Sequence, residues 1–93
     1  MNPATFAEFE TDALRQGYET ALERQWAPLT ELEAHVHPFA AKAVVVQGEM
    51  WLTVGDDTRR LLPGDTFELD ANVSHAERYG AAGATYWVAR RNA

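Results

Sequence analysis

The chain has 93 residues, 46% of them hydrophobic and 11% aromatic, which indicates one small folded domain and excludes a disordered chain. Its 14 acidic and 8 basic residues give a formal net charge of −6, and it has no cysteine. This composition argues against nucleic acid or an anionic membrane as a partner and excludes disulfides and thiolate metal sites. There is no leader-like start and no apolar run of the roughly 18 residues that span a membrane, so we expect a cytoplasmic protein.

The first segment, from about residue 3 to residue 16, has the pattern of a short α-helix. Asn2 or Thr5 can cap its start, and Gly17 takes the position just past the last turn, where helices commonly end. Three apolar residues have the spacing of one helix face: Phe6, Phe9 and Ala13. We expect this stripe to pack against a sheet.

The remainder, about residues 18–91, reads as a series of short strands. Alternating or β-branched runs predict strands at 18–26, 32–37, 43–46, 50–54, 58–62, 66–69, 74–79 and 84–91. Glycine-containing segments at 55–57, 63–65 and 80–83 are predicted to be turns. Many short strands joined in this way are typical of an all-β barrel or jelly roll, here a single domain with one added helix.

The three histidines of the chain form one candidate site. His35 and His37 are two residues apart, so on a strand both imidazoles point to the same face. His75 follows a predicted turn far along the chain and lies on a different strand. Three imidazoles that converge in this way can hold a divalent metal ion on one side.

The spacing around these histidines resembles the first motif of the cupin superfamily. That motif has two histidines separated by one residue, then a glutamate after three or four more, then a glycine after six. His35, His37 and Gly48 match it. The motif's other positions differ here: Leu29 stands where a leading glycine is expected, and Ala41, or Lys42 in the longer spacing, stands where the glutamate is expected.

The second cupin motif is also present in part. Gly64 and His75 match its leading glycine and its histidine at the right separation. Its other positions are replaced: Asp70 for a proline, Asn72 for a glycine and Tyr79 for an asparagine. Asn tolerates the left-handed backbone that glycine otherwise supplies, so this departure is mild. The resemblance covers about residues 32–91 and is closest to small, single-domain, RmlC-like cupins.

The resemblance implies a double-stranded β-helix, that is, a jelly-roll barrel, with a short N-terminal helix. It also implies a divalent metal (Zn, Fe, Ni, Mn or Cu) held by His35, His37 and His75, with no counterpart for the glutamate ligand. Strand alternation gives two candidates for a fourth ligand, Gln47 and Glu77. The alternative is a barrel that binds an organic ligand without metal.

Alternation also suggests what surrounds the histidines. His75, Glu77 and Tyr79 share one face of a regular strand, which makes Glu77 and Tyr79 the candidate catalytic residues, with Glu77 as a general base. The competing interpretation places Glu77 at the rim of the barrel in water. The candidate pocket residues are Phe39, Ala41, Gln47, Trp51, Tyr79 and Tyr86.

Two functions fit these features. The first is a metal-binding cupin acting on a small organic substrate by an unknown reaction. The second is a non-catalytic cupin that binds or senses a small molecule without metal, and the missing glutamate favours it. In both cases we expect a homodimer, because exposed sheet edges need cover.

Overall fold

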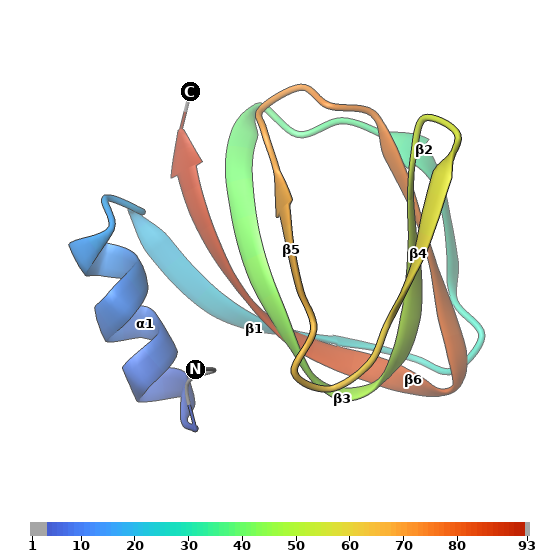
Figure 1. Ribbon diagram of the computed structural model, residues 1–93, viewed down its shortest axis with the longest axis horizontal. Helices are drawn as coiled ribbons and strands as arrows, with labels where there is room; N and C mark the ends of the chain where they lie inside the picture. Colours follow the sequence, from blue (N-terminus) through green and yellow to red (C-terminus); the bar gives the residue numbers. More distant parts are fainter. Residues whose placement is uncertain (1–3, 93) are drawn as a thin grey trace.

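A computed structural model describes residues 4–92 of the chain. One helix is followed by six strands: α1 (Phe6–Arg15), β1 (Thr20–Trp26), β2 (Glu31–His35), β3 (Phe39–Val54), β4 (Asp57–Leu61), β5 (Thr66–Leu69) and β6 (His75–Asn92). The strands curve into a barrel, and the helix lies outside it (Figure 1). This confirms the predicted all-β fold with an added N-terminal helix.

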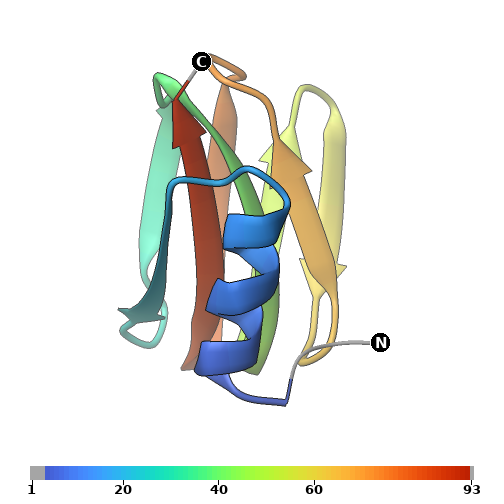
Figure 2. The ribbon, with the colours of Figure 1, turned by 90° about the vertical axis from the view of Figure 1, so that its left-hand side faces the viewer.

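Helix α1 covers the outer surface of the barrel beside β1 and β6 (Figure 2). The Thr5 side chain caps its start by accepting a hydrogen bond of 3.1 Å from the Glu8 N–H, and Gly17 follows its end with φ +95°. Asn2, the other predicted cap, lies outside the described residues. Phe9 and Ala13 are buried in an outer cluster that also contains Trp87, so the predicted stripe packs on the sheet. Among residues 4–92, no helix has the length and apolarity needed to cross a membrane.

Two long antiparallel strands, β3 and β6, form the frame of the barrel. They pair along almost their whole length, from Phe39 opposite Asn92 to Thr53 opposite Ala76. The first part of β3 also pairs with β5 and its last part with β4. The last part of β6 pairs with β1 and its first part with β2. Each long strand therefore belongs to two walls of the barrel, with strand orders β1-β6-β3-β5 and β2-β6-β3-β4 (Figure 1).

The walls meet where β3 and β6 bend, and here the structure corrects two predictions. The segment 80–83 was expected to be a hairpin turn, and residues 43–46 and 50–54 were expected to be separate strands. Both regions are continuous strands instead. Gly48 and Gly83 have φ of +80° and +70°, and a Cβ at Gly48 would collide with the Gly83 carbonyl. The glycines let the two backbones approach closely at a corner, so each strand bends instead of ending.

The bend also changes which residues of β3 face the interior. Val45 is buried in the barrel core, and a register shift follows between Val45 and Gln47. Such a bulge reverses the alternation of inward and outward side chains. Met50 consequently lies in the core, whereas Gln47 is exposed and Trp51 is on the outer surface under the Arg78 guanidinium.

Candidate metal centre

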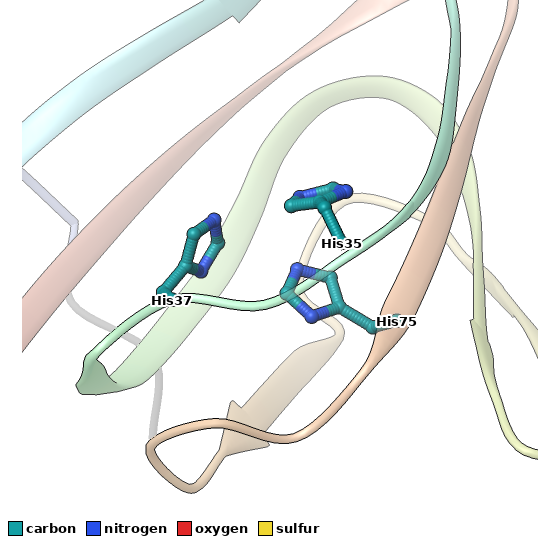
Figure 3. Close-up of side chains that lie close together, drawn as sticks. All are labelled: His35, His37 and His75. Atoms are coloured by element: carbon teal, nitrogen blue, oxygen red, sulfur yellow. The ribbon is translucent and has the colours of Figure 1, made fainter.

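The three histidines meet at the end of the barrel where two connections cross it. His35 is the last residue of β2, His37 lies in the connection to β3, and His75 is the first residue of β6 (Figure 3). His35 and His75 are paired in the β2–β6 register. The ring centroids are 4.4 to 5.0 Å apart, and one nitrogen from each ring lies within 4.8 Å of the others. The predicted convergence of the three imidazoles is thus present in the structure.

Backbone carbonyls orient two of the rings. The His35 Nδ1 lies 2.7 Å from the Glu33 carbonyl oxygen, and the His75 Nδ1 lies 3.0 Å from the Val73 carbonyl oxygen. A carbonyl only accepts, so in each case Nδ1–H donates, and in the neutral form of the ring the lone pair is then on Nε2. Neutral imidazoles held in this tautomer point a metal-binding nitrogen into the site.

Stacking on a neighbouring ring holds the His37 imidazole, and within the described residues 4–92 no hydrogen bond to this ring is found. Its imidazole stacks on the Phe39 ring with centroids 4.8 Å apart and planes 4° apart. Burial, and then the positive charges of His75 and His35 when protonated, lower its pKa below 6.5. His37 is therefore neutral at pH 7, as a metal ligand must be.

The second connection, between β5 and β6, is tied to the first. The Asn72 N–H donates a hydrogen bond of 2.7 Å to the His37 carbonyl, and Asn72 has φ +65°. Leu29, which stands where the first cupin motif has its leading glycine, has φ +60°. The left-handed backbone of the motif is thus kept at both positions without glycine, at a cost of about 1–2 kcal/mol for a residue such as leucine.

Among residues 4–92, Glu77 supplies the one carboxylate next to the histidines. It is buried, with 7% of its surface exposed, which corrects the interpretation that placed it in water at the rim. Its Oε2 lies 3.5 Å from the His35 Nε2 and 3.7 Å from the His75 Nε2. Its Oε1 accepts a hydrogen bond of 2.5 Å from the Tyr79 hydroxyl.

Tyr79 holds that carboxylate from behind. The Tyr79 ring is fully buried and stacks on Trp26, with centroids 5.3 Å apart. Burial, followed by the effects of Tyr86 and the negative charge of Glu77, raises the pKa of Tyr79 far above its usual 10. The hydroxyl therefore stays protonated and acts as a permanent donor to Glu77.

This donor set fits a divalent metal ion. Zn, Fe, Ni and Cu accept three imidazoles as ligands, two of the three rings here are oriented by backbone carbonyls, and an adjacent carboxylate offsets part of the ion's charge. For nitrogens within 4.8 Å of one another, displacements of less than an ångström are enough to reach the metal–nitrogen distance of about 2.0–2.1 Å typical of zinc.

A cavity of about 100 Å³ opens beside the histidines. Among the predicted site residues, Phe39, Ala41, Glu77 and Tyr86 line it, whereas Tyr79 lies behind Glu77. Gln47 and Trp51 are not at this site. The bulge after Val45 turns both outward, so Gln47 cannot be a ligand and Trp51 cannot be a wall of this cavity.

Seven cavity residues were missed by the sequence predictions: Arg24, Trp26, Leu32, Phe67, Leu69, Val88 and Arg90. Two of them are charged, Arg24 and Arg90. Strand alternation could have found both arginines. Arg24 shares a strand face with Leu22 and Trp26, and Arg90 shares one with Tyr86 and Val88. Lys42, which stands at the longer glutamate spacing of the first motif, points away from the cavity and donates a hydrogen bond of 2.9 Å to the Gln16 side chain.

Comparisons with known proteins find a matching protein-family model and several solved structures with a similar fold. A family model described as a cupin domain matches residues 24–88. The structure is similar to the DMSP lyase DddQ from Ruegeria pomeroyi DSS-3, with a TM-score of 0.71, 25% identity, and coverage of 77% of this chain and 37% of that one. An RmlC-like cupin from Shewanella frigidimarina NCIMB 400 has a TM-score of 0.67, 22% identity, and coverage of 76% and 64%. A protein of unknown function from Rhizobium leguminosarum bv. viciae 3841 has a TM-score of 0.71 and 14% identity, with coverage of 100% of this chain and 98% of that one.

These likenesses confirm the jelly-roll barrel. The chain spans less than two thirds of the length of the lyase and of the RmlC-like cupin. No curated protein is similar enough in sequence to count as a match.

Proposed function

The chain belongs to the cupin domain family, and we propose that it binds one divalent transition-metal ion (Zn, Fe, Ni, Mn or Cu) through His35, His37 and His75. The observation that carries this proposal is the convergence of three imidazoles, two of which have their tautomers set by backbone carbonyls. A chance meeting of core histidines does not require that orientation. The proposal extends to a reaction on a small organic substrate in the adjoining cavity.

Glu77 takes the part of the absent motif glutamate in this proposal. Its Oε2 faces two of the ligand nitrogens, so it can serve as a fourth ligand or, if free, as a general base within reach of a molecule in the cavity. Tyr79 is then a positioning residue, since its hydroxyl holds Oε1 and does not reach the cavity. A bound divalent ion supplies Lewis-acid polarisation of a substrate oxygen.

The size of the cavity limits the substrate. About 100 Å³ is well below the roughly 300–1,000 Å³ of pockets that hold drug-sized ligands. The substrate is therefore a molecule of few non-hydrogen atoms. The similarity to a DMSP lyase supports chemistry on a small molecule in a barrel of this kind.

One observation favours the second candidate, a barrel that binds a small molecule without metal. Arg24 and Arg90 line the same cavity as the histidines, and their positive charges oppose the entry of a divalent cation. Glu77 offsets one of these two charges. The two candidates differ in a single measurable property, metal content.

Metal analysis of the untagged protein tests the proposal. The chain has three histidines and no cysteine, so a stoichiometric transition metal has no other strong donor set to occupy. We expect about one ion per chain, lost in His75→Gln and retained in Gln47→Ala, a matched control in which an exposed polar residue is replaced. A wild-type protein that holds no ion and takes up none at micromolar concentration refutes the metal proposal and leaves the metal-free candidate.

A further inference from the structure

The charge inside the cavity is opposite to the charge of the whole chain. The formal net charge of the protein is −6, yet the groups that line the cavity include two guanidinium groups, Arg24 and Arg90, and one carboxylate, Glu77. With neutral histidines the lining carries a net positive charge even before a metal ion is bound. A cavity of this sign attracts an anion.

Arg90 is held in place but not neutralised. Its guanidinium lies over the Phe39 ring, 4.6 Å from the centroid, and its Nε is buried without a hydrogen-bond partner in the part of the chain that the structure describes. A buried donor left unpaired costs about 1–3 kcal/mol. A ligand that accepts a hydrogen bond here removes that cost.

Arg90 also stands next to the position of the missing glutamate. In the β3–β6 register Arg90 is directly opposite Ala41, and side chains opposite each other in antiparallel strands have Cβ atoms about 4.5–5.5 Å apart. A glutamate at position 41 would pair with this guanidinium. With alanine there, the guanidinium faces open cavity.

Arg24 adds a second cation from the neighbouring strand. It lies over the Trp26 ring, 4.7 Å from the centroid. Within residues 4–92, no carboxylate lies within ion-pair distance of either Arg24 or Arg90. Two partly buried guanidinium groups over aromatic rings, both without an acid partner, form a site that an external anion completes.

We propose that Arg24 and Arg90 form a subsite for the carboxylate group of a small organic acid, whose remaining atoms extend toward the three histidines. A carboxylate matches the planar donor fork of arginine, and the rings of Phe39 and Trp26 and the methyl of Ala41 suit a short hydrocarbon chain. The small volume of the cavity excludes a large acid. Carboxylate binding needs only the arginines. Its place in a reaction rests on the proposed metal-dependent function.

Ligand-dependent thermal unfolding of the full chain tests this subsite, with propionate as the probe and propionamide as its neutral counterpart. The shift of the unfolding midpoint with concentration gives the dissociation constant, and both metal-loaded and chelator-treated protein are measured. We expect propionate, and not propionamide, to stabilise both forms of the protein. Arg90→Gln and Arg24→Gln should each weaken propionate binding by at least about tenfold, the loss typical of one charged hydrogen bond.

Two further variants make the result specific. Arg78→Gln is the matched control, because Arg78 is on the same strand as Arg90 and also lies over an aromatic ring, Trp51, but outside the cavity. Its propionate binding should equal that of the wild type. Ala41→Glu restores the motif carboxylate next to Arg90, and it should abolish propionate binding while the protein stays folded and its metal stoichiometry is unchanged.

The outcomes separate the subsite from the metal site. Propionate binding that survives all three cavity substitutions, or that propionamide matches, overturns the subsite. If Arg90→Gln does not fold, Arg24→Gln and Ala41→Glu decide the question by the same criteria. Metal uptake without propionate binding refutes the subsite alone, and propionate binding by a protein that takes up no metal refutes the metal proposal alone.

Discussion

The hydrogen bond from Tyr79 to Glu77 offers a quantitative test of how the candidate site is built. The hydroxyl donates to Oε1 over 2.5 Å, and the two side chains are 1% and 7% exposed. Tyr79→Phe removes this bond and keeps the ring that stacks on Trp26. A hydrogen bond to a charged group contributes about 1.5–3 kcal/mol, so we expect the free energy of unfolding to fall by that amount. At about 4–8 °C per kcal/mol for a domain of this size, Tm falls by roughly 6–24 °C.

Urea unfolding of the metal-free protein measures this loss, and Tyr86→Phe is the control. The Tyr86 hydroxyl accepts a neutral hydrogen bond of 3.2 Å from the Trp26 Nε1, which contributes about 0.5–1.5 kcal/mol. In a Glu77→Gln background the charge-assisted part of the bond to Tyr79 is gone, so Tyr79→Phe should cost about 1 kcal/mol less there. A loss no larger than that of Tyr86→Phe, or one that Glu77→Gln leaves unchanged, would refute the role of Tyr79 in holding the carboxylate.

Four further predictions follow from the fold and the site. Gly48→Ala should lower the free energy of unfolding by more than the about 1–2 kcal/mol that a left-handed backbone costs an L-residue, because its Cβ would meet the Gly83 carbonyl. Gly55→Ala, also at positive φ but in open space, should lower it by about 1–2 kcal/mol only. Urea unfolding of the two variants measures the difference. Asn72→Ala should lose about 1 kcal/mol and Asn72→Gly should lose less than half of that in the same measurement, since the left-handed backbone that supports His37 favours glycine. The pKa of His37 is lowered in the folded protein, so the unfolded chain binds more protons just below pH 6.5. The free energy of unfolding of the metal-free protein should therefore fall as the pH drops through that range, and His37→Gln should reduce the slope of this fall. An equal slope in His37→Gln would contradict the assignment. The homodimer stays a prediction that analytical ultracentrifugation at micromolar concentration checks, and a monomer would contradict it.

Strand alternation predicted most of the inner face of β6 and failed on β3. His75, Glu77 and Tyr79 lie in a regular part of β6, so period-2 spacing correctly put all three on one face, but it left open whether Glu77 lay inside or in water at the rim. The register shift after Val45 reverses the face of Gln47. No residue type marks such a shift in advance. Gly48 signalled an irregularity, but the same glycine is compatible with a strand end, a turn or a bend.

The corner at residues 80–83 could not be predicted for a related reason. Two glycines around two alanines are the usual composition of a hairpin turn. What makes this segment a bend in one strand is the close packing of Gly83 on Gly48 and on the end of β1. That contact joins residues from three strands, and local sequence carries no information about it.

The arginines were missed for a different reason, since their alternation was correct. Arginine is mostly found at protein surfaces, so an inward face was not assigned to Arg24 or Arg90. Each becomes tolerable inside because an aromatic ring lies under its guanidinium and the cavity beside it is open. Burial of a cation without an acid partner is a departure from ordinary folding rules, and such departures concentrate at functional sites.

The two unusual features of the barrel, the absent glutamate and the inward arginines, are connected through one pair of positions. Ala41 and Arg90 face each other across β3 and β6. If a glutamate stood at position 41, the nearest cation would neutralise it, and neither group would be available to a ligand. In this chain Ala41 leaves Arg90 open to the cavity, and Glu77, from the first part of β6, presents a carboxylate to the histidines. The carboxylate near the histidines therefore comes from Glu77 on β6 and not from position 41 on β3. This arrangement leaves negative charge beside the candidate metal site and positive charge where a small anion can enter.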